Sequence, residues 1–175
     1  MCNGDKCSCL TSPDGLTGIC TDVPAVSCHQ EEADTRIFLH AHHAANNDSA
    51  TVVIRSPDTD VAVIGCAMAG EIPAQLIWQT GTRHRRRFVN LTNIARSLGC
   101  ETCKALPGMH AFTGCDSTSA FAGRGTKVAF DLITGAEQRR AMQLLGAEFT
   151  VSDELLSLCE TFVCRMYSHS YYQRE

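Results

Sequence analysis

The chain has 175 residues, enough for one ordinary domain that can bury a core without disulfides or a structural metal. Hydrophobic residues make up 44 % and charged residues 19 %, which excludes a disordered tail and a coiled coil. The net charge of −4 is mild but unevenly distributed. Residues 28–60 carry six acidic side chains against two arginines, whereas residues 83–140 carry ten basic side chains against four acidic ones. This asymmetry suggests a cation site beside a surface for polyanions, and ordinary solvated surface charge is the alternative.

Neither a membrane span nor a signal peptide is visible in the sequence. No apolar run approaches the about 18 residues that a membrane span needs, and residues 1–10 lack the apolar segment of a signal peptide. We therefore expect no membrane partner and an intracellular location.

Eleven cysteines are a high count for this length. In a reducing compartment we interpret them as free thiols or ligands rather than disulfides. Cys100 and Cys103 have the spacing of one zinc knuckle, but no second knuckle accompanies them. A zinc-binding interaction module is the alternative, with ligands from the five cysteines that crowd the first 28 residues: Cys2, Cys7, Cys9 and Cys20 or Cys28.

The predicted elements alternate between strands and helices along the chain. Turn-rich residues 1–29 indicate a short hairpin or an irregular lead-in, and a tail follows the domain at 168–175. Within the domain, residues 30–167, the periodicity predicts strands at 51–55, 75–79 and 87–91 and helices at 31–45, 93–98, 103–112, 127–133, 136–145 and 153–166. This order predicts an α/β fold with a mainly parallel central sheet and a helical C-terminal part.

Acidic residues occur where such a fold would bind a cation. Asp58 and Asp60 follow the strand at 51–55, and in an extended chain residues two apart point the same way. Glu32 and Asp34 lie in the first turn of a predicted helix, and Asp116 lies in a glycine-containing loop. Carboxylate oxygens suit Mg²⁺ or Mn²⁺, so we expect these five acids to hold such an ion. Taken singly, helix-start acids, an Asx turn and a loop aspartate are the structural alternatives.

The order of these motifs resembles a nuclease family. EEADTR, SPDTD and GMHAFTGCDSTSAF, within residues 28–167, are similar to the acidic motifs of the PIN-like/flap-endonuclease (XPG) superfamily, and in particular to a transposon-associated group of animal proteins. The resemblance implies a three-layer α/β/α fold, a nuclear location and two divalent ions about 4 Å apart that hydrolyse a phosphodiester. It implies metal ligation by Glu32, Asp34, Asp58, Asp60 and Asp116 and catalysis by the last three. Family members begin with a strand that ends in a ligating aspartate, which residues 1–30 do not show, so we expect the C-terminal portion of the fold.

Two basic segments are candidates for contacts with nucleic acid. The run RHRRR includes Arg85, Arg86 and Arg87, and guanidinium groups bind phosphate well, although a solvated hairpin tip is equally compatible. The segment Gly123, Arg124, Gly125 and Lys127 resembles the glycine turn with which that superfamily grips DNA, and a plain helix start is its alternative. We expect DNA rather than RNA as partner. We place Phe38, Leu39, Phe112, Phe121 and Phe130 in the core rather than in base stacking, because single-strand binders interleave aromatic with basic residues and that interleaving is absent here.

Two functions therefore stand beside the zinc-binding alternative. The first is a metal-dependent nuclease-like domain that acts on or binds nucleic acid. The second is a non-catalytic nucleic-acid-binding or protein-interaction scaffold on a degenerate PIN-like fold.

Overall fold

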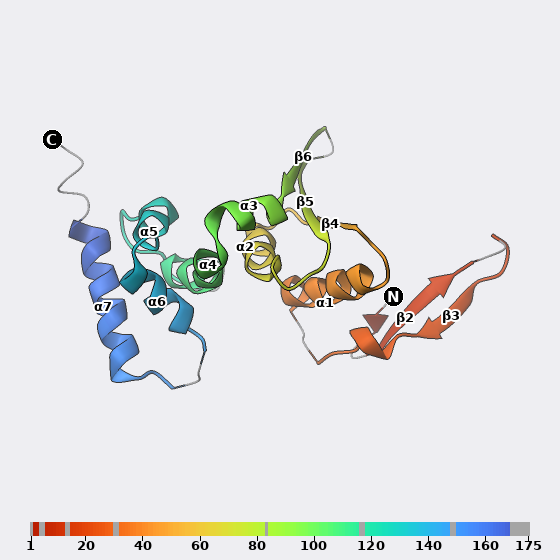
Figure 1. Ribbon diagram of the computed structural model, residues 1–175, viewed down its shortest axis with the longest axis horizontal. Helices are drawn as coiled ribbons and strands as arrows, with labels where there is room; N and C mark the ends of the chain where they lie inside the picture. The colour runs from red at the N-terminus through yellow and green to blue at the C-terminus, as the bar shows by residue number, and fades with distance from the viewer. Residues whose placement is uncertain are drawn as a thin grey trace.

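The computed structural model describes residues 2–3, 6–12, 15–29, 32–82, 84–115, 118–147 and 150–168. The chain is elongated, with an N-terminal hairpin at one end, a sheet with its helices in the middle and a helical part at the other end (Figure 1). The described elements make it a mixed α/β protein. Asp116 and the predicted tail beyond Ser168 lie outside the described residues. No helix in the described ranges is both long and apolar enough to cross a bilayer.

The N-terminal segment is a hairpin rather than an irregular lead-in. Strands β1 (Cys2–Asn3), β2 (Lys6–Thr11) and β3 (Ile19–Asp22) pair antiparallel, and the 3-10 turn η1 (Pro24–Val26) leads to the first helix. Cys7 is disulfide-bonded, so the expectation that every cysteine is a free thiol or ligand is wrong at this position. A sulfur in a disulfide cannot act as a thiolate ligand, and the zinc-binding alternative loses Cys7.

The central sheet is mixed rather than mainly parallel. β4 (Thr51–Arg55) pairs parallel with β5 (Gln75–Thr82), which pairs antiparallel with β6 (Arg85–Asn90). The connections explain the difference. The link from β4 to β5 contains helix α2 (Thr59–Met68) and permits a parallel crossover, whereas only residues 83–84 join β5 to β6, too few for anything but a hairpin.

Helices α1 (Ala33–Asn46), α2 and α3 (Leu91–Leu98) share a core with one face of this sheet. On that face Ile54 and Leu76 are fully buried. Val53 of β4 and Phe88 of β6 belong to the opposite face, where they are 52 % and 63 % exposed. The described residues thus form two layers here, one sheet and one layer of helices.

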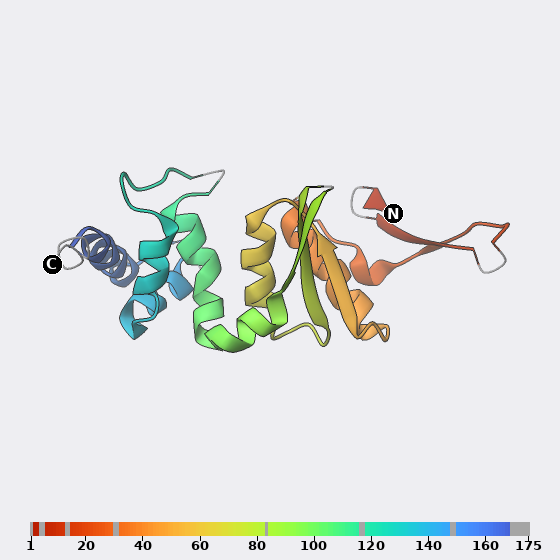
Figure 2. The same ribbon diagram turned by 90° about the horizontal axis from the view of Figure 1, so that it is seen from above.

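The C-terminal part is helical, as the sequence predicts. It comprises α4 (Cys100–Thr113), α5 (Thr126–Leu132), α6 (Ala136–Leu144) and α7 (Asp153–Ser168). Helix α4 contacts α2 on the sheet side and α6 on the other, and so joins the two parts of the molecule (Figure 2). Phe112 of α4 packs edge-on against Phe162 of α7, with ring centroids 5.9 Å apart, which confirms a core role for Phe112.

Candidate functional site

The segment after β4 is a helix cap, not an extended Asp-x-Asp. Asp58 has extended backbone angles and its Oδ1 accepts a hydrogen bond from the Asp60 backbone N–H at 2.9 Å, so it caps α2. The Asp58 N–H donates to Ser56 Oγ at 3.0 Å, and the Trp78 indole N–H of β5 donates to the Ser56 carbonyl at 3.0 Å. These bonds fix the loop at the carboxyl end of the parallel strand. The two aspartates are adjacent because they begin one helix.

Asp60 has a partner that the sequence analysis missed. Its Oδ1 lies 2.7 Å from Nε2 of His110, which comes from the last turns of α4. An ionised carboxylate only accepts hydrogen bonds, so the imidazole Nε2 donates. The two side chains are 30 % and 18 % exposed, so the bond is only partly screened by water. Fifty residues separate the pair. No local spacing could have found it, although His110 stands inside the GMHAF motif.

The elements that carry the other predicted acids end at the same edge of the sheet as Asp58 and Asp60. The start of α1, the end of β4, the start of α2 and the end of α4 lie along one edge, together with the β5–β6 hairpin (Figure 2). Glu32 is the exposed N-cap residue of α1 without a side-chain capping bond, and Asp34 is half-buried in the first turn. Asp116 follows α4 but lies outside the described residues.

A complete metal centre is not formed by the residues that the structure describes. Within the described ranges, no three or more His, Cys, Asp or Glu side chains are grouped so that they could hold a metal ion. Asp58 and Asp60 lie next to each other. Glu32 and Asp34 do not form a metal-holding group with them. One oxygen of each paired aspartate is already engaged, by a backbone N–H and by His110. The described edge therefore offers part of a ligand set.

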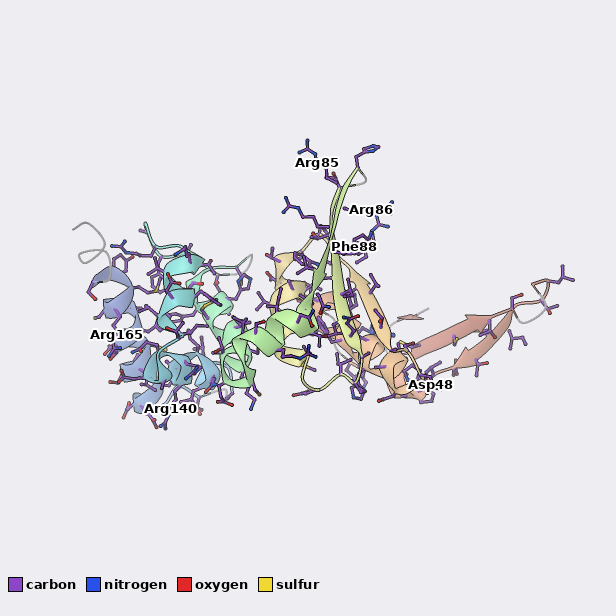
Figure 3. The ribbon with its side chains drawn as sticks, turned by 45° about the horizontal axis from the view of Figure 1, so that its top comes forward. Asp48, Arg85, Arg86, Phe88, Arg140 and Arg165 are labelled. Atoms are coloured by element: carbon purple, nitrogen blue, oxygen red, sulfur yellow. The ribbon has the colours of Figure 1, made fainter. Side chains whose placement is uncertain are left out.

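The arginines of the predicted basic run open strand β6, directly after the turn of the β5–β6 hairpin. Arg85, Arg86 and Arg87 belong to β6 and are exposed (Figure 3). Gly81 of β5 has φ +90°, and a Cβ there would overlap the Arg85 carbonyl oxygen, so glycine is required for the hairpin to close. A hollow of about 190 Å³ lies at the rim of the sheet, lined by residues 55–57, residues 79–82 and Arg86.

The second predicted basic segment is partly used within the protein. Gly123 has φ +68° and Gly125 precedes α5. The Arg124 guanidinium lies 5.0 Å from the ring centroid of Tyr167 and donates to the Tyr167 carbonyl, so it fastens this loop to α7. Among the residues that the structure describes, Lys127 pairs with Asp131 at 3.2 Å, and this ion pair is exposed. Lys127 is thus the more available of the two cations for a phosphate, since exposed pairs of this kind are weak.

A second hollow, of about 310 Å³, lies between α2, α3 and α4. Three cysteines line it: Cys66, Cys100 and Cys103. Burial, and to a smaller extent the neighbouring Cys103, raises the pKa of the Cys66 thiol to about 11, and burial also raises the pKa of Cys103. These thiols stay protonated at neutral pH, which does not favour a thiolate metal centre.

Comparisons of the chain with protein-family models, with curated proteins and with solved structures find no match.

Proposed function

We propose that this chain is a nuclease-like domain on a PIN-like frame that acts on or binds the phosphodiester backbone of nucleic acid, DNA above all. The observation that carries the proposal is the pair Asp58 and Asp60 at the carboxyl end of a parallel strand, with Asp60 held by His110. Ligands of open α/β sheets bind at this edge. The exposed arginines of β6 lie on the same edge and supply the positive charge that a polyanion needs.

Carboxylates next to a phosphodiester repel it unless a cation lies between them. Asp58 and Asp60 are the described residues that would hold Mg²⁺ or Mn²⁺, and Glu32, Asp34 and Asp116 are the further ligands that the sequence resemblance implies. Such an ion, when bound, would supply Lewis acidity to the phosphodiester. The chain's own contribution is positional: His110 holds one oxygen of Asp60 and leaves the other oxygen for a second partner.

A non-catalytic nucleic-acid-binding scaffold is the second candidate. It is favoured by the absence of a three-ligand group among the described residues and by the existing partners of both aspartates. In that case the Asp58 cap and the Asp60–His110 bond would be structural, and the arginines alone would bind the backbone.

Cleavage and binding assays on the same preparations separate the two candidates. Labelled single-stranded, hairpin and flap DNA, with matching RNA, are incubated with Mg²⁺, Mn²⁺ or chelator. The nuclease proposal expects cleavage that needs the metal and is lost in Asp60→Asn but kept in Asp48→Asn. Asp48 suits as control because it is an exposed aspartate with φ 65°, a conformation that asparagine tolerates, at the end of α1 away from the site (Figure 3). Binding without cleavage supports the scaffold, and neither binding nor cleavage refutes both.

A further inference from the structure

The uncovered face of the sheet places an aromatic ring among cationic and polar side chains. In the strand register Arg55, Gln79 and Phe88 stand opposite one another in one row, and Gly81 and Arg86 form the next row. Residues paired in this way point to the same face of a sheet. Arg85 and Arg87 alternate with them and belong to the other face of the hairpin.

Phe88 is presented to solvent on this face. It is 63 % exposed, whereas Tyr167, the other exposed aromatic residue in the described part of the chain, is 39 % exposed. The ring stands on a paired strand, which holds its backbone in place. The hollow of about 190 Å³ is lined by Arg55, Arg86 and Gln79, the strand partner of Phe88. The pattern RRRFVN does not alternate between polar and apolar residues, so it does not predict which face of the strand Phe88 occupies.

Arg55 and Arg86 have no acidic partner within the described part of the chain, which sets them apart from Arg140 and Arg165 of the helical part. There Arg140 pairs with Glu154 at 2.6 Å and Arg165 with Glu137 at 2.9 Å (Figure 3). Cations held on a rigid strand without counter-charges create a local positive potential, and that potential is complementary to a polyanion.

From this juxtaposition we infer that the uncovered sheet face binds a single-stranded segment of nucleic acid, with a base stacked on Phe88 and the flanking phosphates on Arg55 and Arg86. A base has to be unpaired to expose its face to the ring, so a duplex can use the arginines but not Phe88. A protein partner would instead need a continuous apolar patch. Here the polar residues Gln79 and Asn90 share rows with the apolar ones. The inference rests on the proposed function for its class of ligand and adds where and in what form the strand binds.

Fluorescence anisotropy with a short labelled single strand and a blunt-ended duplex of equal charge tests the inference. Phe88→Ala should weaken single-strand binding about tenfold and leave duplex binding unchanged, because stacking contributes about 1–3 kcal/mol per base. Phe88→Leu keeps an apolar side chain on the strand and should lose the same affinity, while Phe88→Trp should retain it. A plot of log affinity against log salt concentration has a negative slope. Arg55→Ala and Arg86→Ala should each make this slope less steep by about 0.7, whereas Arg140→Ala should not change it.

The possible failures are distinguishable. If the wild type binds no nucleic acid at all, the proposed function fails. If it binds but Phe88→Ala and Phe88→Leu, both with unaltered circular dichroism, bind the single strand like the wild type, the sheet-face inference alone is overturned. Concentration-dependent dimerisation that Phe88→Ala abolishes would assign the face to a second copy of the chain and would also overturn it.

Discussion

Replacement of Gly108 in α4 by alanine has two opposed effects on stability, a gain in helix propensity and an overlap with a neighbouring helix. Glycine inside a helix is about 1 kcal/mol less favourable than alanine, so helix propensity alone predicts that Gly108→Ala stabilises the fold. A Cβ at this position would, however, overlap the backbone carbonyl oxygen of Met142 in α6 and stand 3.0 Å from its carbon. The obstacle is backbone, which cannot rotate away as a side chain can. The two helices would have to separate.

Overpacking of this kind costs about 1–3 kcal/mol. We take the upper end, because Gly108 and Met142 are both buried in the one core that runs through the molecule. Subtracting the propensity gain of about 1 kcal/mol leaves a net loss of about 2 kcal/mol. For a chain of this length the loss corresponds to a fall in Tm of about 4–8 °C.

Urea unfolding followed by circular dichroism measures this free energy directly. Ala111→Gly, at an exposed position of the same helix, is the matched control and should lose about 1 kcal/mol through propensity alone. If Gly108→Ala proves as stable as the wild type or more stable, the close approach of α4 and α6 at Met142 is wrong.

Three further predictions concern the site and the thiols. His110→Ala should lower the free energy of unfolding by about 1 kcal/mol, since the bond to Asp60 is charge-assisted but partly exposed; in an Asp60→Asn background the same change should cost less, and equal costs in urea titrations would contradict the contact. Gly81→Ala should disorder the hairpin, because of its φ of +90°, and weaken nucleic-acid binding more than Ala substitution of Arg85 alone, as measured by anisotropy. The raised pKa of Cys66, about 11 in the fold against 9.0 unfolded, means that only the unfolded chain loses this proton between pH 9 and pH 11, so stability falls as the pH rises through that window. Cys66→Ala should reduce this fall by about 2 kcal/mol in urea titrations across it, and an unchanged pH dependence would contradict the burial of the thiol.

Several elements followed from local patterns because their causes are local. The β-branched run at 51–55 is the strand β4, and the three C-terminal helices begin and end within a few residues of the predicted limits. The direction of β6 depends on a two-residue connection rather than on its own composition, and the expectation of a mainly parallel sheet overlooked this.

The candidate site was predictable only in part. Asp58 before an apolar run is a helix-cap signal, and reading it so would have placed Asp60 in the first turn of a helix. The pairing of Asp60 with His110 depends on how α4 packs against α2, and no spacing in the sequence encodes that packing. The exposure of Phe88 likewise follows from which face of the sheet the helices cover.

Helix α4 has a mechanical consequence. It carries Gly108, which meets α6, and His110, which meets Asp60, within a single turn. A displacement of about 1 Å along or around the axis of α4 would stretch the 2.7 Å contact beyond hydrogen-bonding range. The position of α4 therefore controls the contact between His110 and Asp60, and the close approach of Gly108 to α6 helps to fix that position.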